Sequence, residues 1–108
     1  MLILRNEEIQ KCLTMDKCLE ALEQGYKDLL NHQAGYRPRI DLFAPCKRQD
    51  AYYRWGTMEG ADAYKGYFAI RMKSDILYWT EAKTEEKYCV EPGTFCGLVF
   101  LFSTHNGE

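Results

Sequence analysis

Basic side chains recur in the strand-like middle of this sequence, and they are the residues best suited to do chemistry. Arg37 and Arg39 flank a proline, Arg54 lies in an aromatic segment, and Arg71 and Lys73 share a third segment. A guanidinium can hold a carboxylate through two parallel hydrogen bonds, and a lysine adds a point charge or a proton donor. The pattern indicates a site for a small molecule that carries a carboxylate.

The segment from Tyr67 to Ile76 has the alternation of a strand with one apolar face. Side chains of a strand point to opposite faces in turn, so Arg71 and Lys73 are expected side by side on one face. The other face then carries Phe68, Ile70, Met72 and Ile76. Two neighbouring cations repel unless an anion lies between them, which makes this strand a candidate anion clamp.

A plainer interpretation of the same cations stays open. Acidic residues occur at similar spacing in the same segments, at Asp41, Glu59 and Asp75. The cations could pair with these carboxylates on a solvated sheet face, where ion pairs contribute little.

The elements that must position these residues follow an α+β order. Asn6 and Thr14 are suitable N-caps for a short helix and for a longer helix, and the apolar stripe of the longer helix is expected to face the core. Strands are expected at 39–44, 51–56, 67–76 and 97–103, with a charged loop or lid at 81–87. We therefore predict two N-terminal helices packed on a mostly antiparallel sheet. The last strand is apolar on both faces, which predicts a central position.

Composition narrows the class of protein. The chain has 108 residues, 46% of them apolar and 14% aromatic, which is enough for one domain with a core. Its net charge of −2 gives no electrostatic case for nucleic acid, and no apolar run approaches the roughly 20 residues of a membrane helix. Five cysteines without a CxxC pair predict reduced, mostly buried thiols, no metal site and a cytoplasmic protein.

Several motifs, taken in order, resemble the N-terminal region of the ornithine cyclodeaminase/mu-crystallin family. The resemblance covers essentially the whole chain. The quoted stretches are Met1-Leu2-Ile3-Leu4, Leu13-Thr14-Met15-Asp16, Arg37-Pro38-Arg39, Met58, Gly93-Thr94-Phe95-Cys96-Gly97-Leu98 and Asn106-Gly107-Glu108. The chain departs from the family pattern at Glu59, where a proline is usual, and at Arg71, where a lysine is usual.

The resemblance implies a function and roles for the site residues. It implies the substrate-binding and dimerisation part of an NAD(P)-dependent enzyme that exchanges a hydride with an amino or imino acid. Arg39 and Arg71 would bind the carboxylate, Lys73 would be a second cation or the catalytic proton donor, and Tyr53 and Met58 would line the pocket. NAD or NADP would be bound by a Rossmann domain that this chain lacks. The Asn-Gly turn signal near Glu108 has no returning strand, so residues 1–108 are predicted to be a fragment of a two-domain protein, inactive alone.

Two further hypotheses remain beside this one. The chain could be a non-catalytic carboxylate-binding or accessory subunit, for which nicotinamide binding is the discriminating property. It could also be chiefly a dimerisation element, a homodimer whose exposed aromatics are the anchors. The candidate anchors are Tyr52, Trp55, Tyr78 and Trp79.

Overall fold

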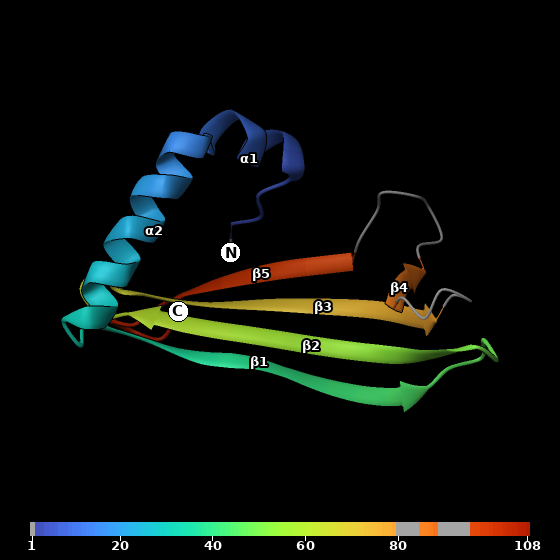
Figure 1. Cartoon of the computed structure of the whole chain (residues 1–108). Coiled ribbons are helices and arrows are strands. Elements are labelled where there is room, and N and C mark those ends of the chain that lie inside the picture. The colour runs from blue at the N-terminus through green and yellow to red at the C-terminus, as the bar shows by residue number, and fades with distance from the viewer. Residues whose placement is uncertain (1, 80–84, 89–95) are drawn as a thin grey trace.

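The computed structural model describes residues 2–79, 85–88 and 96–108 and has the predicted α+β architecture. Two helices precede a sheet in which every described pairing is antiparallel (Figure 1). The elements are α1 (Asn6–Cys12), α2 (Met15–Leu30), β1 (Ala34–Pro45), β2 (Ala51–Asp62), β3 (Tyr67–Trp79), β4 (Glu85–Tyr88) and β5 (Cys96–Ser103).

The two helices begin where short polar signals allow it. The N-cap of α1 is Arg5, one residue before the predicted Asn6, and its backbone nitrogen donates to the Glu8 carboxylate at 2.8 Å. Thr14 caps α2 as expected, because its hydroxyl accepts a hydrogen bond from the Lys17 backbone nitrogen at 3.3 Å. No described helix is long and apolar enough to cross a membrane.

The sheet is built from two long hairpins and a pair of shorter strands. Strands β1, β2 and β3 follow one another in space, and both β4 and β5 pair with β3 on its remaining edge (Figure 1). The turn between β2 and β3 ends at Gly66, which has a φ of 79° and suits the left-handed region. The Asn-Gly turn signal is confirmed, since the Gly107 nitrogen donates to the Ser103 carbonyl at 2.9 Å.

The register divides the sheet into two chemically different faces. One face, here called the charged face, carries Arg39, Asp41, Arg54, Arg71, Lys73 and Asp75. The other, here called the apolar face, carries mostly hydrophobic side chains from β1, β2, β3 and β5. Its hydrophobic members include Ile40, Leu42, Trp55, Ile70, Met72, Leu98, Phe100 and Phe102.

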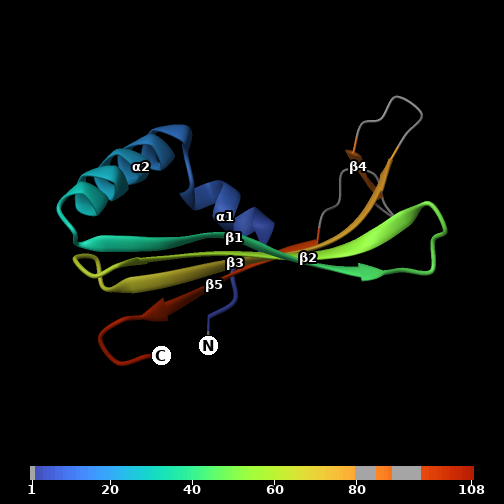
Figure 2. The ribbon, with the colours of Figure 1, turned by 60° about the horizontal axis from the view of Figure 1, so that its bottom comes forward.

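Both helices lie on the charged-face side of the sheet (Figure 2). Helix α2 meets the sheet at its C-terminal end, near the start of β1, and rises away from the strands. Its apolar stripe is therefore exposed, and the prediction that this stripe is core is wrong for the described residues. The exposed members are Met15, Leu19, Leu22, Tyr26 and Leu30.

Two other predictions about strands need correction. Among the described strands, β5 pairs with β3 alone, so it is an edge strand and not a central one. A strand that is apolar on both faces needs other elements packed above and below the sheet. Neighbouring strands in the same sheet do not cover these faces, so the pattern does not require a central position. Part of the predicted 81–87 loop, Glu85–Tyr88, is strand β4, and positions 81–84 lie outside the described residues.

Candidate functional site

A bulge in β1 decides which of the two proline-flanking arginines joins the charged face. The register of β1 against β2 shifts between Arg37 and Ile40, so three steps along β1 match two along β2. Arg37 therefore lies opposite Glu59 on the apolar face, whereas Arg39 lies beside Asp41 on the charged face. Without the bulge, residues two apart in a strand would share one face.

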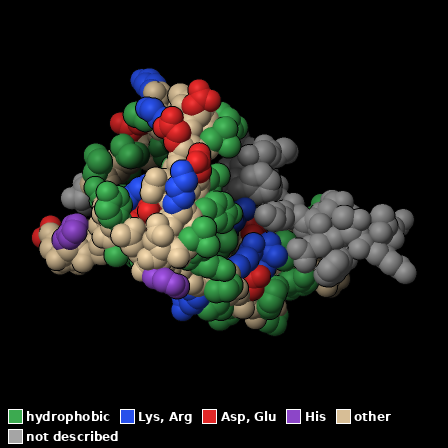
Figure 3. All heavy atoms as spheres, turned by 60° about the vertical axis from the view of Figure 1, so that its left-hand side comes forward, with side chains coloured by type: hydrophobic (Ala, Val, Ile, Leu, Met, Phe, Trp, Pro, Cys, Tyr) green, Lys and Arg blue, Asp and Glu red, His purple; other side chains and the backbone are tan. Residues whose placement is uncertain are grey.

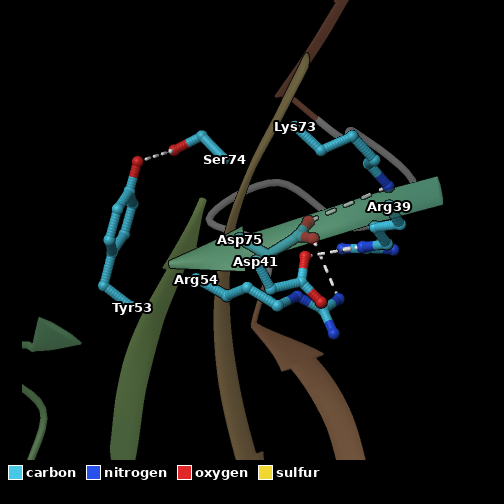
Figure 4. A network of polar contacts seen from close by, with 7 residues as sticks. All are labelled: Arg39, Asp41, Tyr53, Arg54, Lys73, Ser74 and Asp75. Carbon is cyan, nitrogen blue, oxygen red and sulfur yellow. Dashed lines mark hydrogen bonds and ion pairs between the residues drawn. The ribbon is translucent and has the colours of Figure 1, made fainter. Parts of the chain in front are cut away.

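The charged face holds two groups of ion pairs, Arg39 with Asp41, and Asp75 with both Arg54 and Lys73 (Figure 4). Arg54 Nη2 is 3.1 Å from Asp75 Oδ2, and Lys73 Nζ is 3.8 Å from Asp75 Oδ1. Arg39 Nε donates to Asp41 Oδ1 at 2.6 Å. Arg54 and Asp75 are buried, with 9% and 5% of their surfaces exposed, so this pair exchanges little with solvent.

Gly56 makes room for the Arg39–Asp41 pair over β2. A Cβ atom at this buried position would lie 2.6 Å from Asp41 Oδ1 and 2.7 Å from Arg39 Nη2. Real contacts of that length do not occur, so any larger residue would displace the two side chains. Glycine within a strand often marks such a close approach, and this was the sequence signal that could have pointed to the site.

Arg71 differs from the other cations of the charged face. Its side chain is exposed, and it has no hydrogen bond or ion pair with any residue that the structure describes. It lies directly across from Met58 in the pairing of β2 with β3. The same face also carries Asp62 at the end of β2, so the named residues of the charged face contain four cations and three carboxylates. They carry one positive charge in excess, which favours the binding of an anion.

The structure brings together four of the five residues proposed for the site. Arg39, Met58, Arg71 and Lys73 all lie on the charged face. Tyr53 does not join them, because it lies on the apolar face and its hydroxyl contacts the Ser74 hydroxyl at 3.1 Å (Figure 4). A strand places adjacent residues on opposite faces, and Tyr53 precedes the charged-face Arg54 by one. Tyr53 therefore cannot line the same pocket.

The plainer interpretation, in which the cations pair with nearby acids, is confirmed for most of them. Arg39 pairs with Asp41, and both Arg54 and Lys73 pair with Asp75. On the apolar face, Arg37 pairs with Glu59. Asp41, Glu59 and Asp75 do not pair with Arg71, the other cation of the proposed clamp. Arg71 is therefore the strongest single candidate for contact with a ligand.

The Arg37–Glu59 pair on the apolar face is tightly hydrogen bonded. Arg37 Nε donates to Glu59 Oε2 at 2.7 Å, and Arg37 Nη2 donates to the other carboxylate oxygen. The hydrogen bonds from Arg37 lower the pKa of Glu59, and the same bonds raise the pKa of Arg37. Such a two-point contact holds the edge strand β1 to β2 just before the bulge.

A groove of about 460 Å³ lies between α2 and the sheet. Small residues such as Gly25, Gly60 and Ala69 form much of its wall, together with Tyr26 and Tyr67. Ala69 lies two residues before Arg71 on the same face of β3, although Arg71 itself does not line the groove.

Other kinds of site have less support in the described residues. No group of three or more His, Cys, Asp or Glu residues there is placed to hold a metal ion. Three of the five cysteines are free, with Cys12 exposed and Cys18 and Cys46 half-buried, which corrects the prediction of mostly buried thiols. The Cys89 residue and the Cys96 side chain lie outside the described part of the chain.

The comparisons with known proteins leave the family open. No protein-family model matches the chain, no curated protein matches it, and no solved structure matches it.

Proposed function

We propose that this chain is the substrate-binding part of a cytoplasmic, NAD(P)-dependent enzyme of the ornithine cyclodeaminase/mu-crystallin type. Its ligand is a small amino or imino acid, bound by its carboxylate on the charged face, and the protein is a homodimer. The observation that carries the proposal is Arg71, an exposed guanidinium unpaired with any described residue, on the same sheet face as three cations that pair with Asp41 and Asp75.

Each charged residue has a part in this proposal. Arg71 holds the carboxylate by two parallel hydrogen bonds, and Arg39, oriented by Asp41, adds a second cation at the site. Lys73 is the candidate proton donor near the ligand nitrogen, and its contact with Asp75 holds its ammonium group on the charged face. Met58, directly opposite Arg71, packs against the apolar part of the ligand.

The nicotinamide cofactor is proposed to bind outside this chain. Dinucleotides bind at a glycine-rich turn between a parallel strand and a helix, and the described strands pair only antiparallel. We therefore assign no cofactor-binding residue here. The same observation favours a second candidate, a carboxylate-binding subunit without its own chemistry. Titration of the protein from its native source with NADH and NADPH, followed by nicotinamide fluorescence, separates the two.

The Arg71→Ala variant tests the carboxylate site. Isotope-labelled protein would be titrated with L-proline, L-ornithine and pyruvate, while backbone and arginine side-chain resonances are followed by NMR. A charge-assisted contact contributes about 1.5–3 kcal/mol, so the variant should lose affinity by about tenfold or more. L-prolinamide, which lacks the carboxylate, should not bind.

Lys65→Ala is the matched control, because it removes one exposed positive charge from the β2–β3 turn, away from the cluster. Its affinity should stay within about a factor of two of the parent, since a distant exposed charge is strongly screened. Equal losses in both variants would indicate a general charge effect. An unchanged affinity in Arg71→Ala would refute the clamp.

A further inference from the structure

The groove between α2 and the sheet is a second candidate site, separate from the carboxylate site. Its volume of about 460 Å³ is in the range of pockets that hold small molecules. Its floor is the end of the charged face nearest α2, and the helix forms the opposite wall (Figure 2). Arg71 does not line it, so a ligand bound there needs no carboxylate.

Gly25 leaves part of this groove open. It lies in the interior of α2, although glycine is an unfavourable residue in a helix. A glycine in a helix often allows another element to approach closely, but a Cβ atom at Gly25 would meet no described atom within 4 Å. No described neighbour therefore requires glycine at this position, and the missing side chain leaves space that a ligand can fill.

Three tyrosines from three different elements line the groove. They are Tyr26 of α2, Tyr36 of β1 and Tyr67 of β3. Each is more than half exposed, so its ring is accessible to a ligand. The face of an aromatic ring carries partial negative charge, and it attracts an organic cation.

Asp62 supplies the charge of the groove. Of the described residues that line it, Asp62 alone is charged at neutral pH. Its Oδ1 atom accepts a hydrogen bond from the Lys65 backbone nitrogen at 2.9 Å, and its half-buried carboxylate forms no ion pair with a described cation. A carboxylate without a counter-ion, next to tyrosine rings, favours a positively charged ligand.

We propose that the groove binds a small organic ammonium ion with an apolar body. Asp62 and Tyr67 are directly opposite each other in the pairing of β2 with β3, so the ammonium group lies between the carboxylate and the ring. The next pair on the same face is Gly60 with Ala69. These small residues leave room for the apolar body between the sheet and Gly25.

Two probes of nearly the same shape test the charge preference of the groove. 2-Phenylethylamine carries a positive charge at pH 7, and 2-phenylethanol is neutral. Isotope-labelled protein would be titrated with each while the backbone amides of Gly25, Gly35 and Gly60 are followed by NMR. The amine should shift these resonances and bind about tenfold more tightly than the alcohol. Equal affinities, or an amine that leaves these resonances unmoved, would overturn the proposal.

Asp62→Asn removes the charge and keeps an oxygen that can accept the Lys65 hydrogen bond, so the β2–β3 turn should be preserved. The variant should bind the amine no more tightly than the alcohol. Glu20→Gln is the matched control, because Glu20 is an exposed carboxylate of α2 that does not line the groove. Its affinity for the amine should stay within about a factor of two of the parent. Equal losses in both variants would indicate general charge attraction and overturn the site.

Gly25→Leu tests the position of the ligand by filling the groove. It should abolish binding of 2-phenylethylamine without lowering Tm, because leucine is more favourable than glycine in a helix. Retained binding would overturn the proposal. Pyruvate separates this site from the proposed carboxylate site: its binding should weaken in Arg71→Ala and persist in Asp62→Asn, whereas binding of 2-phenylethylamine should show the reverse. Loss of amine binding in Arg71→Ala would place the amine at the carboxylate site and overturn the groove.

Discussion

The buried pair of Arg54 and Asp75 is the energetic centre of the charged cluster. Both side chains are nearly inaccessible to water, and Asp75 also contacts Lys73. Taking two ions out of water costs about as much as their attraction returns, so the intact pair adds little net stability. Removing one partner is different, because it leaves a buried charge without compensation.

Asp75→Ala should therefore lower the free energy of unfolding by about 3–5 kcal/mol. Asp41→Ala is the matched control: it removes a carboxylate from an ion pair that is partly exposed, so it should cost about 1 kcal/mol or less. Urea denaturation of both variants measures the difference. Replacing Arg54 by Met and Asp75 by Leu together should recover most of the loss. Equal costs in the two single variants would show that burial does not distinguish the pairs.

Strand β1 shows how a side-chain ion pair adds to the backbone pairing that sets the register of a strand. Its bulge separates the Ala34–Arg37 end from the rest of the strand, and the Arg37–Glu59 pair joins that end to β2. The bulge also carries Arg39 to the charged face. The arrangement of the site therefore depends on the register of a strand at the edge of the sheet.

The Arg37–Glu59 pair predicts a pH dependence of stability. The folded-state pKa of Glu59 is lowered below 4.5 by the Arg37 hydrogen bonds, so its contribution is present above the unfolded-state value. It is lost as the pH falls through the lower, folded-state value. Glu59→Gln should thus be less stable than the parent chain near pH 7, with the difference shrinking below about pH 4.

Urea titrations of both proteins between pH 7 and pH 3 would measure this. Asp50→Asn serves as the control. The pKa of the exposed Asp50 carboxylate is also lowered by a hydrogen bond from Arg48, but this pair lies within one loop and joins no two strands. A stability difference for Glu59→Gln that does not change with pH would contradict the assignment.

At the scale of the whole molecule, the sheet carries ion pairs on one face and exposed hydrophobic side chains on both faces. Side chains of the hydrophobic class form much of the visible surface in Figure 3. Of the described hydrophobic side chains, Leu77 is the one that is buried. A layered domain needs a second layer over each apolar surface, and the apolar face lacks one among the described elements.

If a second copy supplies that layer, thermal stability must depend on concentration. Mass action favours the folded dimer, and the unfolding entropy of two chains of 108 residues implies that Tm rises by about 3 °C for each tenfold increase in protein. Calorimetry over a hundredfold concentration range would measure the shift. A concentration-independent Tm in the parent chain would mean that folding is not coupled to assembly.

The sequence by itself determined the local features of this protein. Helical periodicity, the Thr14 cap and strand alternation predicted both helices, the three long strands and the shared face of Arg71 and Lys73, because each depends on residues within a few positions. The acidic partners of the cations were also foreseeable from their spacing.

Only the tertiary structure decided where these features meet. Three features depend on contacts between segments that are distant in the sequence. They are the register shift that places Arg37 and Arg39 on opposite faces, the position of β5 at an edge of the sheet, and the exposure of the apolar stripe of α2. An apolar pattern states that a surface must be covered, but it does not state by what. That is why a strand apolar on both faces was predicted to be central, although the structure places β5 at an edge of the described sheet.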